Sequence, residues 1–235
     1  MSKTALITGA SRGIGRETAK RLLQSPEVST IVVAARPSSA YEATLEELRS
    51  EAEQLGKQVV DLTVDVGDRS ALQEALKPLG ERVGNIDILV NNAGYTNPVP
   101  VHQIEFEDFE RTMSVNLYGP FTLIQDLLHQ GNSFDLIVNI ASTAGIKGRS
   151  GWLTYSASKA ALINMSDVLR EELAIFGTRV VSISPGRTAT DLRKVLAPDE
   201  DPATIMQPDS VAEVIGMLAS PVGQYIDSEN LVVRQ

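Results

Sequence analysis

Short apolar runs rich in β-branched residues recur along the chain, and each predicts a β-strand. They cover residues 4–8, 30–34, 59–64, 86–90, 136–140 and 180–183. The runs are apolar almost throughout instead of alternating with polar residues. This pattern is typical of strands that helices cover on both faces of a parallel sheet.

Helical patterns fill the segments between these strands, over residues 16–23, 41–55, 70–79, 106–128 and 155–173. The alternation of strand and helix, with right-handed crossovers, predicts an α/β fold with a doubly wound parallel sheet. The ligand crevice of such a sheet lies beyond the carboxyl ends of its strands. We therefore expect the chemistry of this protein in the segments that follow strands.

The chain has 235 residues and contains no repeat and no linker of distinct composition, so we expect one domain over residues 1–235. Residues 197–208 are rich in prolines and acidic residues and come after the sixth predicted strand and its turn. This segment fits a mobile flap over the crevice and, equally well, a solvated loop.

The composition of the chain argues against several classes of function. A formal net charge of −9 and a pI near 4.8 provide no broad positive field, which disfavours nucleic acid and membrane surfaces as partners. The absence of cysteine excludes disulfides and thiol catalysis, and the first apolar run is too short for a signal or membrane segment. We expect a cytoplasmic protein.

A glycine-rich segment over residues 8–15, Thr-Gly-Ala-Ser-Arg-Gly-Ile-Gly, follows the first predicted strand and opens the first predicted helix. At such a junction, backbone N–H groups and the positive end of the helix can face a pyrophosphate. A tight turn without a ligand would also favour glycine. The predicted cofactor-binding residues of this segment are Gly9, Ser11, Arg12, Gly13, Ile14 and Gly15.

The spacing Thr-Gly-x-x-x-Gly-x-Gly resembles the short-chain dehydrogenase/reductase family in its compact form, and later motifs keep that family's order. The resemblance implies a Rossmann-like sheet of about seven strands, in the order 3-2-1-4-5-6-7, and a nicotinamide dinucleotide cofactor. NAD-binding proteins of this fold place an acidic residue after the second strand, whereas a 2′-phosphate calls for arginine. Ala35 and Arg36 follow that strand here and Arg12 lies in the glycine segment, so we expect NADP(H).

Three further segments resemble cofactor motifs of the family. One is the end of the third strand, where the family's acidic residue meets the adenine. The others are Asn-Asn-Ala-Gly at residues 91–94, which borders the cofactor ribose, and Pro-Gly-Arg-Thr-Ala-Thr at residues 185–190, beside the nicotinamide carboxamide. The predicted cofactor-binding residues in these segments are Asp65, Val66, Asn92, Ala93, Gly94, Pro185, Gly186, Thr188 and Thr190.

Tyr155 and Lys159 are four residues apart, so on a helix both side chains project from one face toward the same ligand. Ser142 comes just after a predicted strand, and Asn116 completes a set that resembles the family's catalytic residues. Each residue taken alone is also explained by an ordinary role, as helix cap, polar helix residue, core-edge tyrosine or surface charge.

The resemblance implies a role for each member of this set. A free tyrosine has a pKa of about 10, and the Lys159 ammonium together with an oxidised nicotinamide would favour the phenolate. Lys159 would also form hydrogen bonds with the nicotinamide ribose, and it would bind the cofactor together with Tyr155. Ser142 would hold the substrate oxygen, and Asn116 would anchor a water molecule of a proton relay. Tyr155 would exchange the proton while a hydride moves between nicotinamide and carbonyl carbon.

Substrate identity is less well defined. The residues expected as apolar pocket walls, which core packing explains nearly as well, are Ile146, Trp152 and Leu192. The residues that would suit an anionic substrate, but that solvated surface charge explains better, are Lys147, Arg149 and Arg187.

The sequence therefore predicts an NADPH-dependent carbonyl reductase or alcohol dehydrogenase that acts on a small molecule. It needs no metal, and His102 and His129 do not form a metal-ligand pair. The main alternative is a catalytically silent NADP(H)-binding sensor on the same fold. An epimerase or dehydratase is disfavoured by the glycine spacing and the short chain.

Relatives of this kind are usually homodimers or homotetramers that associate through the long helices carrying Asn116 and Tyr155, although monomers occur. Residues 223–227, Gly-Gln-Tyr-Ile-Asp, resemble the family's last strand but lack the Gly-Gly that usually follows it. Oligomer contacts at the carboxyl end are therefore left open.

Overall fold

The computed structural model describes residues 2–226 and 229–235, and these form one parallel sheet of seven strands. The strands are β1 (Lys3–Thr8), β2 (Val28–Ala35), β3 (Gln58–Thr63), β4 (Ile88–Asn91), β5 (Leu136–Ile140), β6 (Arg179–Pro185) and β7 (Asn230–Val233). Their order is β3-β2-β1-β4-β5-β6-β7, and each neighbouring pair is parallel. The predicted doubly wound α/β sheet and its strand order are confirmed.

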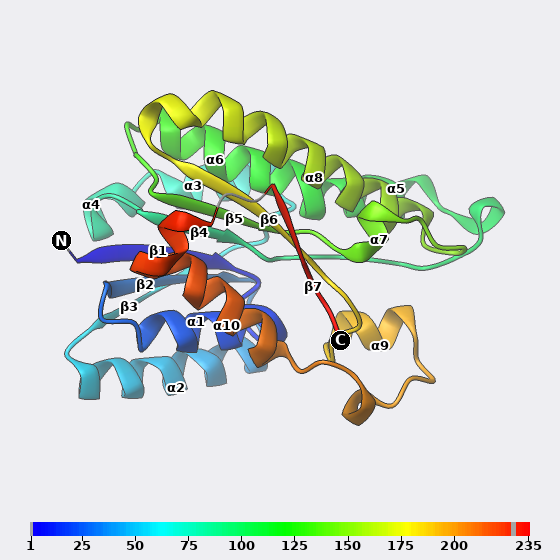
Figure 1. Cartoon of the computed structure of the whole chain (residues 1–235), viewed down its shortest axis with the longest axis horizontal. Coiled ribbons are helices and arrows are strands. Elements are labelled where there is room, and N and C mark those ends of the chain that lie inside the picture. The colour runs from blue at the N-terminus through cyan, green and yellow to red at the C-terminus, as the bar shows by residue number, and fades with distance from the viewer. Residues whose placement is uncertain (1, 227–228) are drawn as a thin grey trace.

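Helices cover both faces of this sheet (Figure 1). On one face lie α1 (Gly13–Leu23), α2 (Ser39–Leu55) and α10 (Pro208–Ala219). On the other lie α3 (Arg69–Leu76), α4 (Leu79–Val83), α6 (Gly119–His129) and α8 (Leu153–Leu173). In β1, Ile7 packs in the first layer and Leu6 in the second. Burial on both faces is why the strands read as apolar runs.

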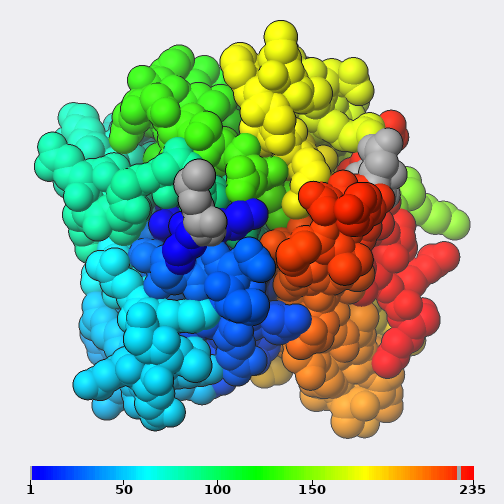
Figure 2. All heavy atoms as spheres, turned by 60° about the vertical axis from the view of Figure 1, so that its left-hand side comes forward, coloured from blue at the N-terminus to red at the C-terminus, as the bar shows by residue number. Residues whose placement is uncertain are grey.

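Helices near the two ends of the sequence pack together on the first face. Helix α10 packs against α1, although the two are far apart in sequence (Figure 2). Arg21 of α1 donates a hydrogen bond from Nε to Glu213 of α10 at 2.9 Å. Within residues 2–226 and 229–235, no helix has the length and apolar character that a bilayer crossing requires.

The helix predicted over residues 106–128 is interrupted. Helix α5 (Phe106–Met113) is followed by a π-helical turn (Ser114–Tyr118) before α6 begins. Pro120 has no N–H, so it cannot donate the α-helical hydrogen bond to the carbonyl of Asn116. Asn116, a predicted catalytic residue, lies within this π-turn, and such turns are frequent at functional sites.

The prediction of a last strand within residues 223–227 is wrong. Residues Pro221–Tyr225 form a 3₁₀ helix, and β7 begins at Asn230; Asp227 lies outside the described residues. The sheet is completed instead by Leu231 and Val233, which pack against the core beside β6. The earlier segment still contributes Ile226 to this core, but from outside the sheet.

Residues 197–208 are anchored at several points. Helix α9 (Asp191–Leu196) leads into the segment, which contains a 3₁₀ turn (Pro202–Thr204). Met206 is buried, bridges to Thr188, and accepts a backbone hydrogen bond from Ala189 at 2.8 Å. The segment is thus packed at its carboxyl end, and its mobility stays a prediction.

Candidate active site

A cavity of about 910 Å³ lies beyond the carboxyl ends of strands β1 to β6. All predicted site residues except Gly15 and Asn116 line it. They are Gly9, Ser11, Arg12, Gly13, Ile14, Arg36, Asp65, Val66, Asn92, Ala93, Gly94, Ser142, Tyr155, Lys159, Pro185, Gly186, Thr188 and Thr190. The sheet therefore gathers residues from six loops into one space, and their individual roles stay predictions.

The glycine segment joins β1 to the amino terminus of α1. Gly9 has φ +66°, and a Cβ built on it would lie 2.8 Å from the Cα of Ala93, so the loop after β4 approaches too closely for a side chain. Gly15 lies within α1 and does not line the cavity; its Cβ would lie 2.4 Å from the carbonyl oxygen of Gly9. Gly15 thus allows helix and turn to pack, while Gly9 faces the cavity.

The motif after β4 fastens the glycine segment in place. The side chain of Asn92 donates to the carbonyl oxygens of Thr8 at 2.9 Å and Gly9 at 3.3 Å. The hydroxyl of Thr8 accepts from the backbone N–H groups of Asn92 and Ala93, both at 3.0 Å. These bonds explain the pairing of Thr8-Gly9 with Asn92-Ala93 in the sequence.

Positive charge collects where a 2′-phosphate is predicted to bind. Arg36 is exposed, lines the cavity, and has no ion-pair partner among the described residues. Arg12 is paired with Asp191 through Nη1 at 2.8 Å, and its side chain is 62% exposed. Of the two predicted arginines, Arg36 is therefore the one whose guanidinium forms no ion pair with the described residues.

Asp65 carries an ion pair that the sequence did not indicate. Its carboxylate accepts from Arg111 Nη2 at 2.5 Å and from the N–H of Gly67 at 2.9 Å. Burial raises the pKa of Asp65, but the hydrogen bonds from Arg111 and Gly67 outweigh burial, and the net pKa lies below its usual value. Asp65 is therefore an ionised acceptor at this end of the cavity.

Ser142, Tyr155 and Lys159 meet at the other end. Ser142 caps the short helix α7 (Thr143–Ile146) by accepting from the N–H of Ala144 at 3.1 Å. Helix α7 packs directly on α8, since a Cβ on Gly145 would lie 2.7 Å from the carbonyl carbon of Lys159. This contact places the residue that follows β5 beside the helix that carries Tyr155.

Lys159 is almost completely buried and lies 5.9 Å from the centre of the Tyr155 ring. Its Nζ donates to the carbonyl oxygen of Ile140 at 2.7 Å. Burial lowers the pKa of Lys159 to about 8. At neutral pH the ammonium form still predominates.

Burial dominates the effect of the protein's own groups on the pKa of Tyr155. Burial raises the pKa of its hydroxyl, against the lowering effects of a hydrogen bond with Ser142 and the charge of Arg193. Among the protein's own groups, the cost of burying a phenolate exceeds the stabilisation from Ser142 and Arg193. The hydroxyl keeps its proton at neutral pH. The predicted phenolate depends also on an oxidised nicotinamide, and it stays a prediction.

Asn116 makes a structural connection between two elements. Its Oδ1 accepts from the N–H of Tyr95 at 2.8 Å, and its Nδ2 donates to the carbonyl of Tyr95 at 3.0 Å and to Ser158 Oγ at 2.9 Å. The side chain is fully buried and does not line the cavity. It ties the loop after β4 to α8 at the residue that directly precedes Lys159.

The turn after β6 forms the opposite wall. Thr188 is buried and lines the cavity, and Thr190 caps α9 by accepting from the N–H of Arg193 at 3.1 Å. Of the predicted apolar walls, Trp152 and Leu192 line the cavity. Ile146 does not, because its side chain is exposed to solvent, so this prediction is wrong.

Several lining residues were missed by the sequence reasoning, among them Tyr95, Arg111 and Arg193. Arg111 lies on α5, forty-six residues from the carboxylate it binds. No local motif marks such a contact. Arg193 could have been noticed, since it follows the capping Thr190 in the turn after β6.

A doubly wound parallel sheet whose glycine turn opens α1 beside a cavity at the strand ends defines the class of Rossmann-like dinucleotide-binding folds. The family described as short chain dehydrogenase matches residues 3–201 of the chain. The protein belongs to the short-chain dehydrogenase/reductase family.

Known proteins resemble this chain over nearly its whole length. The 3-oxoacyl-[acyl-carrier-protein] reductase FabG of Thermotoga maritima is 33% identical over 240 residues, covering 97% of this chain and 94% of its own. A blue fluorescent protein from a metagenomic library, solved in complex with NADPH, has a TM-score of 0.86 and 29% identity, covering 99% of this chain and 96% of its own. The 3-ketoacyl-(acyl-carrier-protein) reductase of Brucella melitensis, complexed with NADH, has a TM-score of 0.83 and 27% identity, covering 99% and 96%.

Proposed function

We propose that this protein is an NADP(H)-dependent oxidoreductase that interconverts a ketone and a secondary alcohol, with Tyr155 as the proton donor and acceptor. The observation that carries the proposal is the position of Tyr155, which lines the same cavity as Ser142, Lys159 and the glycine turn. A silent sensor would have no need to keep this set together.

The described residues fit a nicotinamide dinucleotide. Gly9 leaves a space that a Cβ would fill at the start of α1, where backbone N–H groups suit a pyrophosphate. Asp65 is the candidate for the adenine end, and Lys159 and Thr188 for the nicotinamide end. When bound, the reduced cofactor supplies the hydride.

Arg36 favours NADP(H) over NAD(H). Its guanidinium has no carboxylate partner in the described part of the chain. The end of β2 carries Ala35 and Arg36, where NAD-binding proteins of this fold have an acidic residue. The structural neighbours include complexes with both NADPH and NADH, so the family alone does not decide between them. The charge beside β2 is the local reason for the choice.

In the reducing direction, Ser142 positions the substrate oxygen and Tyr155 transfers its hydroxyl proton to that oxygen as negative charge develops there. The raised pKa of Tyr155 keeps this proton available through the neutral range. Lys159, mostly protonated below its pKa of about 8, then lies close enough to stabilise the phenolate that remains.

The test measures NADPH consumption with a panel of diketones, quinones, pteridines and 3-oxoacyl thioesters; the thioesters are included because relatives carry that name. We expect at least one substrate. Tyr155→Phe should abolish turnover and leave NADPH binding intact, whereas Tyr225→Phe, at a tyrosine 82% exposed, should change neither. Turnover that survives Tyr155→Phe would refute the proton-transfer role.

We also propose that the protein forms a homo-oligomer through α5, α6 and α8. Large apolar side chains are exposed on this side of the molecule, which an isolated chain would leave in water. They are Phe106, Tyr118, Phe121, Leu153 and Val168. Light scattering after size exclusion should give a dimer or tetramer, and Phe121→Lys should shift it toward monomer; a monomeric wild type contradicts this.

A further inference from the structure

Three arginines gather at the Tyr155 end of the cavity. Arg149 comes from the loop between α7 and α8, whereas Arg187 and Arg193 come from the segment after β6. All three line the cavity together with Trp152. Two loops that are separate in sequence therefore bring guanidinium groups to one place, beside the residues proposed to bind the carbonyl.

Trp152 connects the two loops. The guanidinium of Arg149 lies 5.5 Å from the centre of its ring, and that of Arg193 lies 5.6 Å from the same centre. Cation–π contacts of this length orient a guanidinium while leaving its N–H groups free to bind oxygen. The indole therefore serves as a common platform for two positive charges.

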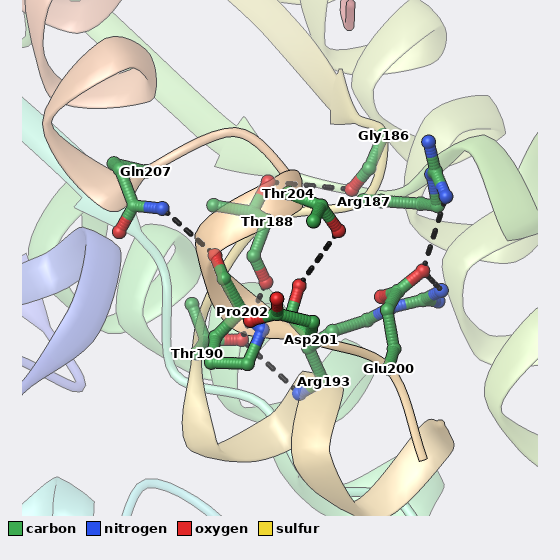
Figure 3. Close-up of polar contacts among 10 residues, drawn as sticks. All are labelled: Gly186, Arg187, Thr188, Thr190, Arg193, Glu200, Asp201, Pro202, Thr204 and Gln207. Atoms are coloured by element: carbon green, nitrogen blue, oxygen red, sulfur yellow. Dashed lines mark hydrogen bonds and ion pairs between the residues drawn. The ribbon is translucent and has the colours of Figure 1, made fainter. Parts of the chain in front are cut away.

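One carboxylate pairs with two of the three arginines, Arg187 and Arg193, and it belongs to the segment over residues 197–208 (Figure 3). Glu200 accepts from Arg193 twice, from Nε at 2.6 Å and from Nη2 at 2.9 Å, and both side chains are 16% exposed. Arg187 reaches the same carboxylate with one contact at 3.2 Å, and its side chain is 60% exposed. Arg193 is thus committed to Glu200, and Arg187 is held only weakly.

Arg149 has no ion-pair partner among the described residues. The carboxylates that line the cavity do not supply one. Asp191 is paired with Arg12 and Lys194, and Asp65 with Arg111. Three guanidiniums facing one carboxylate leave this end of the cavity with uncompensated positive charge, which attracts an anion.

We propose that the substrate carries an anionic group, a carboxylate or a phosphate, and that Arg149 and Arg187 bind it while Tyr155 and Ser142 hold the carbonyl. This specificity rests on the proposed reductase function. The two arginines come from separate loops that line the same cavity, so a bound anion would connect the loop before α8 to the segment before α9. Arginine suits both anions, because its planar fork matches carboxylate and phosphate oxygens.

The first test compares related ketones with and without an anionic group. The pairs are pyruvate with methyl pyruvate, acetoacetate with methyl acetoacetate, and dihydroxyacetone phosphate with dihydroxyacetone; the last pair separates phosphate from carboxylate. We expect kcat/KM with NADPH to be at least about tenfold higher for the anionic member of one pair or more, the effect of one charge-assisted contact.

Variants then assign the effect to the arginines. Arg149→Met and Arg187→Met should each lower kcat/KM for the anionic substrate by about tenfold and change that for its neutral partner less than twofold. Lys147→Met removes a positive charge two residues from Arg149 that does not line the cavity, so it should change neither. Equal losses in the Lys147 variant would mean long-range charge, and would overturn the assignment.

The second test needs no turnover. Trp152 is the single tryptophan of the chain, so its fluorescence reports directly on the proposed anion site. With NADP⁺ present, pyruvate or dihydroxyacetone phosphate should shift this emission saturably, the neutral partners should not, and Arg149→Met should weaken the response about tenfold.

The outcomes separate the two proposals. Failure to consume NADPH with any ketone, combined with a saturable anion response at Trp152, would contradict the reductase and support the anion site. Reduction of the neutral members or of uncharged 3-oxoacyl thioesters at equal or higher kcat/KM, unaffected by Arg149→Met, would support the reductase and overturn the anion site. Absence of both signals would refute both.

Discussion

Replacing Lys159 by methionine should stabilise the protein although it removes a proposed active-site residue. Lys159 is 3% exposed, and burial lowers its pKa from 10.5 to about 8. At about 1.4 kcal/mol per pH unit, keeping it charged in the folded state costs about 3 kcal/mol at pH 7. Methionine lacks the 2.7 Å hydrogen bond to the Ile140 carbonyl, which contributes about 1.5 kcal/mol. We therefore expect the free energy of unfolding of Lys159→Met to exceed that of the wild type by about 1–2 kcal/mol.

The pH dependence makes this prediction specific. Because the folded pKa is below the unfolded one, the cost is fully present below about pH 8 and fades as pH rises toward 10.5. Between pH 7 and pH 9.5 the free energy of unfolding of the wild type should therefore rise by about 2 kcal/mol relative to that of Lys159→Met. Urea unfolding at both pH values measures this gap.

A matched control is Lys77→Met, at a lysine whose side chain is 65% exposed; it should shift stability by less than about 0.5 kcal/mol at either pH. Two results would refute the reasoning. One is a Lys159→Met protein that is less stable than wild type at pH 7. The other is a gap that stays the same at both pH values, since desolvation of a titrating group cannot produce it.

Three further predictions concern the cofactor and the core. Gly15→Ala brings a Cβ within 2.4 Å of the Gly9 carbonyl oxygen, so it should cost about 2 kcal/mol in urea unfolding and weaken NADPH binding; unchanged binding would contradict the packing argument. Arg36→Ser should raise the Kd for NADPH by about 10- to 100-fold and leave that for NADH nearly unchanged, as measured by nicotinamide fluorescence; equal losses would contradict the 2′-phosphate role. Asn139→Ala removes two buried hydrogen bonds, one from the Asn91 amide and one to the Ser166 hydroxyl, and should cost about 3 kcal/mol, whereas a loss below about 1 kcal/mol would show that the partners re-pair.

Much of the fold follows from local pattern alone. Strands buried on both faces must be apolar at successive positions, so six of the seven could be located before the structure was known. The seventh strand could not be located, because both residues 223–227 and residues 230–233 have a sequence that suits the strand beside β6. Only the packing beside β6 shows that Asn230–Val233 forms it. The π-turn at Asn116 was not predicted either, because Pro120 removes one α-helical hydrogen bond but does not by itself fix what replaces it.

The candidate site divides in the same way. Sequence by itself determined the glycine turn and the pairing of Tyr155 with Lys159, because both depend on spacing within one turn or one helix. Only the tertiary structure decided that Glu200 holds Arg193, that Arg111 holds Asp65, and that Tyr155 keeps its proton. Ion pairs and pKa values depend on the distances and burial that folding creates between distant segments, and these are absent from any local pattern.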